Sequence, residues 1–159
     1  MIIDTAIEWI FRFWAYVFFG FVMEIKVTAI SKVTDGTITQ DDRKLHGNIS
    51  LWMIPVYGLL ILFFFEAVNS SIESLNIIIR YIVWSITFTF FEILSGWFYD
   101  RFLHIRPWDY RKDRGSICNG YTKIHYIPLW GLVGLVIEQY SSLMIYISPG
   151  VVEYFKNIM

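Results

Sequence analysis

Four long apolar stretches constrain the fold of this chain more than any other feature. They lie near residues 9–29, 53–71, 78–99 and 127–147. A helix needs about 20 mostly apolar residues to cross about 30 Å of hydrocarbon, and each stretch is long enough. Lipid offers the backbone no hydrogen-bond partners, and runs such as 60–65 do not alternate as barrel strands do. We therefore predict an all-α polytopic membrane protein with four transmembrane helices.

The composition points to the same class of protein. Hydrophobic residues make up 56% of the 159 and charged residues 17%, against about 45–50% and about 25% in soluble domains. The lipid bilayer is therefore an expected partner. A net charge of −1 gives no field that would attract nucleic acid, so we expect no nucleic-acid partner. The N-terminal sequence lacks the basic region and cleavage site of a removable signal peptide, so the first helix is expected in the mature protein.

The basic residues predict an orientation in the membrane. Ten of the thirteen lie in the connections after the first and third spans. They are Lys26, Lys32, Arg43, Lys44, Arg101, Arg106, Arg111, Lys112, Arg114 and Lys123. By the positive-inside rule, loops 30–50 and 100–126 are predicted to be cytoplasmic, with the N- and C-termini outside.

Two segments share one layout of a glycine, seven residues, a proline, one residue, an aromatic residue and a glycine. Their members are Gly47, Pro55, Tyr57 and Gly58 in the first, and Gly120, Pro128, Trp130 and Gly131 in the second. The match predicts an internal duplication of about 9–71 and 78–147 within a single membrane domain of residues 1–159. Each half holds two spans, so the repeats are predicted to be parallel. Both prolines are expected in the first turn of a helix.

Each predicted span carries one glutamate, and the set is Glu24, Glu66, Glu92 and Glu138. A charged side chain near the bilayer centre costs about 2.5–3.5 kcal/mol on insertion scales, so these residues need an explanation. One hypothesis is a polar interior that binds a cation, a proton or a polar solute. The alternative is that the carboxylates bind Tyr, Trp, Ser or Thr side chains and hold the helices together. Glycines at helical spacing from Glu24, Glu92 and Glu138 indicate that these faces point into the bundle.

The connection after the third span contains a second group of candidates, Arg106, Trp108, Asp109, Tyr110 and Arg111. This pattern is typical of a positive-inside anchor with aromatic rings at the headgroups. A site for an anionic lipid headgroup or phosphate is the alternative, because arginine binds phosphate in a bidentate manner.

Three histidines, His46, His104 and His125, are expected on the same side as Asp109, where they could form an acid–base set if the loops converge. Their spacing matches no metal motif, and the only cysteine, Cys118, excludes an internal disulfide or a CxxC site. No nucleotide-binding or hydrolase motif occurs either. We therefore predict no metal and no cofactor.

Several of these residues together resemble a known family. They are the loop Pro107-Trp108-Asp109-Tyr110, Glu92 four residues before Gly96, Trp130-Gly131 before Glu138, Gly20 before Glu24, and Trp52 before Tyr57-Gly58. From about Arg12 to Tyr140 the chain resembles the transmembrane protein 229 family and its bacterial relatives labelled ABC-transporter permeases of the CmpB type. The resemblance implies a small polytopic membrane protein related to transport.

Three functional hypotheses follow. The leading one is a transport-related or solute-binding membrane component lined by the four glutamates, either a homo-oligomer or the partner of another membrane subunit or an ATPase. The second is a membrane-embedded, lipid-modifying enzyme that uses Asp109 and a nearby histidine at the cytoplasmic interface. The third is a structural assembly subunit.

Overall fold

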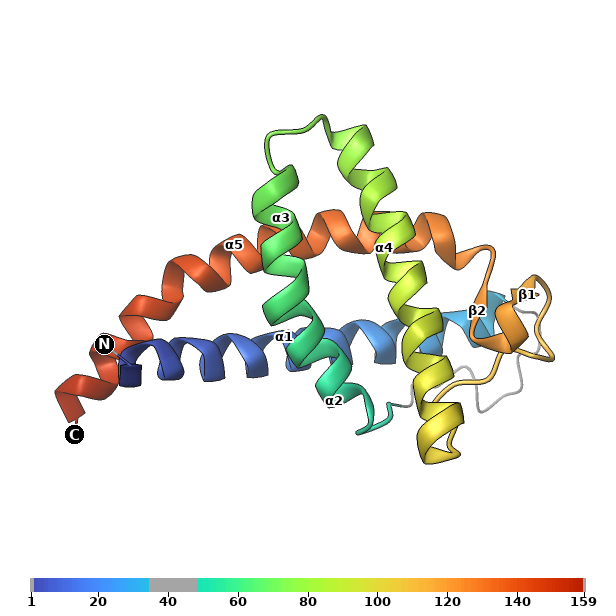
Figure 1. The fold of residues 1–159 in the computed structure, drawn as a ribbon, viewed down its shortest axis with the longest axis horizontal. Coiled ribbons are helices and arrows are strands. Elements are labelled where there is room, and N and C mark those ends of the chain that lie inside the picture. The colour runs from blue at the N-terminus through green and yellow to red at the C-terminus, as the bar shows by residue number, and fades with distance from the viewer. Residues whose placement is uncertain (1, 35–48, 159) are drawn as a thin grey trace. The chain divides into compact units, whose positions relative to one another are not determined.

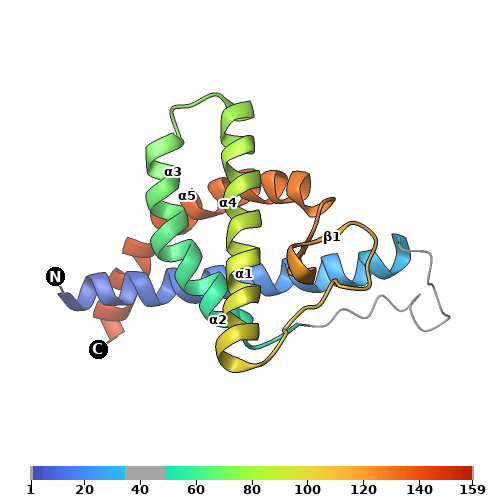
Figure 2. The ribbon, with the colours of Figure 1, turned by 45° about the vertical axis from the view of Figure 1, so that its right-hand side comes forward.

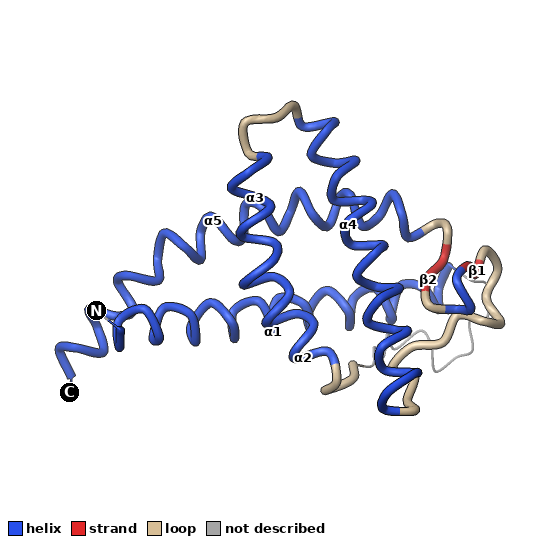
Figure 3. The backbone as a smooth tube through the Cα atoms, viewed as in Figure 1, coloured by secondary structure: helices blue, strands red, loops and turns tan. Residues whose placement is uncertain are grey.

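The computed structural model describes residues 2–34 and 49–158, with side chains described for 3–26 and 49–158. Arg43, Lys44, His46 and Gly47 lie outside the described residues, as does the side chain of Lys32. Helix dominates the described part of the chain, where strand is limited to one short hairpin (Figure 3). The predicted all-α class is confirmed.

The described part of the chain is mainly a series of helices, and some of them join without an intervening loop (Figure 1). In chain order they are α1 (Ile2–Thr34), α2 (Met53–Pro55), the π-helix η2 (Val56–Phe65), α3 (Glu66–Ile72), α4 (Ile77–Phe98), the π-helical turn η3 (Tyr99–Leu103) and α5 (Tyr126–Ile158). The segments α2, η2 and α3 are continuous, and α4 continues directly into η3. Pro55 and Pro128 are each the third residue of their helix, which confirms their predicted place in a first turn.

Four helices are long and apolar enough to cross a membrane: Ile3–Lys26, Met53–Ile72, Ile77–Leu103 and Tyr126–Ile158. The predicted number of spans is confirmed, and the helix that contains the last predicted span, 127–147, continues beyond it. The helix passes through Pro149 and ends at Ile158. Beyond the proline, Val152 is buried and Lys156 forms a 2.9 Å ion pair with Asp4, and these contacts favour continuation of the helix.

The chain divides into two compact units. One comprises Met1–Phe64 with Ile147–Met159, and the other comprises Phe65–Tyr146. The second unit therefore contains α3, α4, the connection that follows η3 and the first part of α5. Asn76 caps the N-terminus of α4, because its side chain accepts a 2.8 Å hydrogen bond from the Ile78 backbone N–H.

The connection between η3 and α5 is folded and runs back beside the end of α4 (Figures 1 and 2). It contains the antiparallel strands β1 (Ser116–Ile117) and β2 (Thr122–Lys123), joined by the 3-10 turn η4 (Cys118–Gly120). A Cβ atom on Gly96 would lie 2.9 Å from the Tyr121 ring and 3.3 Å from Trp108. The connection thus packs directly against α4, and glycine permits that close approach.

Candidate functional site

Glu138 on α5 is held by two side chains of α4. Its Oε1 accepts a 2.6 Å hydrogen bond from Trp84 Nε1, and its Oε2 lies 3.1 Å from an Arg80 guanidinium nitrogen. Glu138 is only 3% exposed and Trp84 is fully buried. A Cβ on Gly134 would lie 2.3 Å from the Trp84 Cβ, so the glycine lets the two helices approach closely. As predicted for its face, Glu138 points toward another helix.

Glu92 on α4 has the reciprocal arrangement with α5. Its Oε2 accepts a 2.9 Å hydrogen bond from Trp130 Nε1. Trp84 and Glu92 are eight residues apart, as are Trp130 and Glu138. The helices α4 and α5 therefore exchange two Trp-to-Glu hydrogen bonds, and the Trp and Glu of each helix are eight residues apart. Each carboxylate has its own indole donor, so the two carboxylates do not share one site.

The surroundings of Glu92 differ from those of Glu138. Lys123 of β2 is close enough to interact with it electrostatically, and the hydroxyl of Thr122 lies beside it. Thr122 is fully buried, and no other side chain in the described parts of the chain bonds its hydroxyl. The Glu92 carboxylate therefore faces an indole N–H and a buried hydroxyl, and it forms no ion pair within the described residues.

In the other unit, Glu24 on α1 accepts a 2.9 Å hydrogen bond from the Tyr57 hydroxyl on η2. A Cβ on Gly20 would lie 2.4 Å from the Tyr57 ring, so this glycine also permits close helix packing. Glu66 is the first residue of α3 and is half-buried. The polar candidates in the spans thus lie at contacts between helices in at least three of the four cases.

Matching positions of the two halves make matching contacts. Tyr57 and Trp130, which follow the two prolines, donate to Glu24 and Glu92. A Cβ on Gly58 would meet Phe13, and a Cβ on Gly131 would meet Tyr81, at the corresponding position. These contacts support the predicted duplication, although the superposition of the halves remains a prediction.

The arginines within the spans were not predicted as partners of the glutamates. Arg12 and Arg80 each lie twelve residues before a glutamate and are followed by aromatic residues one and four positions later. This repeated spacing marks Arg80 as a position of the duplicated pattern, but it does not identify Glu138 as its partner. One difference between the halves is an extra residue between Gly58 and Glu66, compared with Gly131 and Glu138. The π-helix η2 lies there, and a wider helical turn accommodates an inserted residue.

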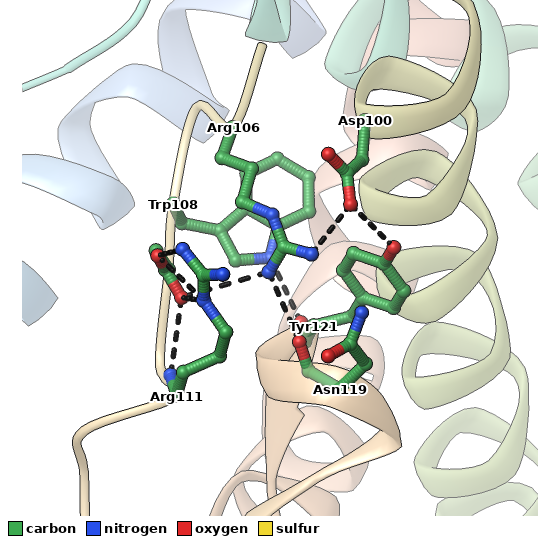
Figure 4. Close-up of polar contacts among 7 residues, drawn as sticks. Asp100, Arg106, Trp108, Arg111, Asn119 and Tyr121 are labelled. Atoms are coloured by element: carbon green, nitrogen blue, oxygen red, sulfur yellow. Dashed lines mark hydrogen bonds and ion pairs between the residues drawn. The ribbon is translucent and has the colours of Figure 1, made fainter. Parts of the chain in front are cut away.

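The loop candidates form a backbone clasp (Figure 4). Arg106 Nη1 donates to the carbonyl of Asn119 at 3.0 Å, and Trp108 Nε1 donates to the carbonyl of Tyr121 at 2.8 Å. Between them, the Tyr110 backbone N–H donates to the Gly120 carbonyl at 3.0 Å. Three successive carbonyls are therefore bound by one short motif. Cys118 and Asn119 both have positive φ angles, a strained arrangement that these hydrogen bonds help to stabilise.

Carboxylates fix the arginines of this clasp. Asp109 binds Arg111 through both carboxylate oxygens and lies 3.6 Å from Arg106. The side-chain and backbone hydrogen bonds from Arg111 lower the pKa of Asp109 to about 2. Asp100 accepts hydrogen bonds from Arg106 at 2.5 Å and from the Tyr121 hydroxyl at 2.8 Å (Figure 4). A carboxylate so strongly held by arginines is a poor general base.

Lys123 forms a second cluster in the connection. Its ammonium bonds Asp113 at 3.0 Å and lies over the rings of Tyr110 and Tyr126, at 4.8 and 4.6 Å. Burial opposes its protonation, but the hydrogen bonds to Asp113 and Tyr126 outweigh burial and raise the pKa of Lys123. His125 Nε2 is hydrogen-bonded to the Arg114 carbonyl at 3.2 Å. Of the six loop candidates, the structure joins five in the clasp and gives His125 a separate contact.

Within residues 2–34 and 49–158, no group of three or more His, Cys, Asp or Glu side chains is arranged to hold a metal ion. A family model described as "Putative ABC-transporter type IV" matches residues 11–159. Comparison with curated proteins and with solved structures gives no match.

Proposed function

Because this chain belongs to the family described as "Putative ABC-transporter type IV", we propose that it is a transport-related or solute-binding component of a membrane. Its four apolar helices make it a multi-pass protein surrounded by lipid. In this proposal, Glu24 is a polar interior position of the first unit, and Glu66, Glu92 and Glu138 are polar interior positions of the second, with different roles for different glutamates.

The neighbourhood of Glu92 is the observation that carries the proposal. One carboxylate oxygen is bound by Trp130, and the fully buried Thr122 hydroxyl lies beside it. A cation or a small polar solute bound there would contact both the carboxylate and this hydroxyl, and no directly bound cationic side chain of the described residues occupies the place. The ammonium of Lys123, which is held by Asp113, adds a positive group on one side. A carboxylate with an ammonium on one side favours a ligand whose positive charge faces Glu92 and whose other side is neutral or negative, as in a zwitterion.

The other glutamates have partners that suggest other roles. Arg80 compensates the charge of Glu138, so this residue is proposed to hold α4 and α5 together. Glu24 receives a hydrogen bond from a neutral phenol, Tyr57, which leaves it a candidate for the polar lining. Glu66 is proposed as a polar lining residue of the second unit.

Ligand-dependent stability tests this assignment. Purified protein in nanodiscs of neutral lipid would be titrated with sodium, potassium or glycine, with choline chloride keeping the ionic strength constant. We expect at least one probe to raise Tm, by an amount equivalent to about 2.7 kcal/mol at 100 times Kd. Glu92→Gln and Thr122→Val should abolish the rise. Glu138→Gln is the matched control and should keep it at a lower starting Tm. No response to any probe, or a full response in Glu92→Gln, would refute the proposal.

The proposed orientation places loops 30–50 and 100–126 in the cytoplasm and both termini outside. It rests on the distribution of the basic residues. Cys118 is exposed and is the only cysteine, which makes it a natural probe. A membrane-impermeant thiol reagent should label it in lysed cells and leave it unlabelled in intact cells. Equal labelling in intact and lysed cells would show that Cys118 faces outward, opposite to the proposed orientation.

Partners also belong to the proposal. A four-helix chain encloses at most a narrow pathway, so we propose a homo-oligomer or association with another membrane subunit or an ATPase. Affinity purification from mild detergent, with crosslinking before lysis, would identify such a subunit. We also propose that the chain is related to the transmembrane protein 229 family. The residues that support this relation are the loop Pro107–Tyr110 and residues of the helices on either side of it.

A structural assembly subunit is the second candidate, and the reciprocal Trp-to-Glu hydrogen bonds favour it. In that case Glu92→Gln would change stability but no ligand response would exist. The enzyme hypothesis has less support, because Asp109 is held by two arginines and His125 is bonded to a backbone carbonyl.

A further inference from the structure

The folded connection has an uneven charge balance. Its acidic side chains are Asp109 and Asp113, with Asp100 at the end of the preceding helix. Each is paired inside the fold: Asp100 with Arg106, Asp109 with Arg111, and Asp113 with Lys123. Three of the basic residues are thereby compensated.

Three other basic residues of this region are not compensated. Arg101, Lys112 and Arg114 are exposed, and their side chains form no ion pair with any residue in the described parts of the chain. The region therefore carries about three positive charges on flexible side chains that are available to an external anion. The sequence alone does not distinguish the three basic residues that form ion pairs from the three that do not.

The position of the region along α4 indicates what the external anion is. The helix Ile77–Leu103 has 27 residues and a length of about 40 Å, about 10 Å more than the hydrocarbon layer. Its first end is marked by the polar connection Glu73–Asn76. Trp97, Phe98 and Phe102 are exposed near its other end, as expected of rings at the headgroup level. Arg101 lies among them in the chain, so rings at the headgroup level would bring it to the level of the lipid phosphates.

Contacts hold the rest of the connection at this end of α4. Trp108 and Tyr121 pack against Gly96, and the Tyr99 and Trp108 rings contact each other with centroids 6.4 Å apart. Lys112 and Arg114 lie in the same folded connection, whose backbone is clasped by Arg106 and Trp108. Their side chains are long enough to reach from this clasp to nearby headgroups.

We propose that this end of the protein binds the headgroups of anionic phospholipids through Arg101, Lys112 and Arg114. Arg106 and Arg111, although they belong to the loop motif, stabilise the clasp and do not bind lipid. The partner is the anionic leaflet, because the aromatic rings and the three cations meet the membrane at one level. The inference concerns a different surface from Glu92 and does not depend on the proposed solute site.

Lipid retention measures this surface directly. The protein would be reconstituted in nanodiscs of phosphatidylcholine with or without 30% phosphatidylglycerol, and the bound lipid would be identified by native mass spectrometry. Each basic residue near a charged leaflet adds about 1 kcal/mol, a factor of about five in affinity. Arg101→Gln, Lys112→Gln and Arg114→Gln should therefore each reduce the preference for phosphatidylglycerol about five-fold, and the triple variant should lose it. Raising the salt concentration should weaken the wild-type preference.

A charge-preserving triple variant, Arg101→Lys with Lys112→Arg and Arg114→Lys, is the matched control. It exchanges the three side chains without changing net charge and leaves the Asp109–Arg111 pair intact, so it should retain the wild-type lipid preference. A preference for phosphatidylglycerol in the triple glutamine variant equal to that of the wild type would overturn the proposal. Loss of the preference in the charge-preserving variant would show that charge at these positions does not determine binding and would also overturn it. Competition by inorganic phosphate, beyond that of chloride at equal ionic strength, would indicate a site for free phosphate. The single variants keep the test valid if the triple variant does not fold.

Discussion

Glu92 and Glu138 offer a comparison within one unit of the protein. Both accept a hydrogen bond from a tryptophan indole on the opposite helix. Arg80 contacts Glu138 directly, whereas Lys123 acts on Glu92 without forming an ion pair, and its ammonium is bonded to Asp113. One carboxylate is thus compensated by direct contact, and the other is open to further contacts. Similar sequence motifs can therefore provide a structural anchor and a candidate binding group on the same pair of helices.

The largest expected effect would come from breaking the Arg80–Glu138 pair. Arg80→Met leaves a 97% buried carboxylate without its cation, and removal of one partner of a buried pair costs about 3–5 kcal/mol. The double variant Arg80→Met with Glu138→Leu should recover most of that loss, because neither charge remains. Unfolding by SDS titration in mixed micelles measures the stability of Arg80→Met, of Glu138→Leu and of the double variant. If the loss in the double variant equals the sum of the two single losses, the two side chains are not coupled.

The two tryptophans sharpen the comparison with a smaller effect. Trp84→Phe removes the donor to Glu138 while an aromatic ring remains to stack on Phe65, whose ring centroid is 4.1 Å away. Loss of a hydrogen bond to a charged group costs about 1.5–3 kcal/mol. Trp130→Phe should cost less, about 1 kcal/mol, because Trp130 and Glu92 are only half-buried. The same SDS titration ranks the two variants. A larger loss for Trp130→Phe would mean that Glu92, and not Glu138, is the main anchor.

Asp109 extends the comparison to an arginine-paired carboxylate in water, where the smallest effect is expected. Its pKa is lowered to about 2 by Arg111, so folding favours the ionised form. The stabilisation is present above the unfolded pKa of about 4 and is lost as the pH falls toward 2. Pepsin cleavage within 104–125 should therefore increase in the wild type between pH 4 and pH 2. Asp109→Asn should already be cleaved at pH 4, and an identical pH profile for the two proteins would contradict this account.

Some local features were readable because they depend on short stretches of chain. Prolines three residues into a helix and the number of spans follow from backbone chemistry and apolar length. The continuation of α5 past residue 147 was not predicted, because it depends on the contacts of Val152 and Lys156. The role of Arg106 was also open, because phosphate binding and carbonyl binding use the same guanidinium geometry.

The sequence by itself determined that this chain is a four-helix membrane protein with carboxylates in its spans, since helix length and the absence of water in lipid leave few alternatives. Only the tertiary structure decided which polar groups satisfy one another. It paired Trp84 and Arg80 with Glu138, placed Thr122 beside Glu92, and used the loop arginines to bind carboxylates and carbonyls. The physical reason is that a hydrogen bond or ion pair depends on distances of about 3 Å between residues far apart in the sequence, and periodicity alone carries no information about them.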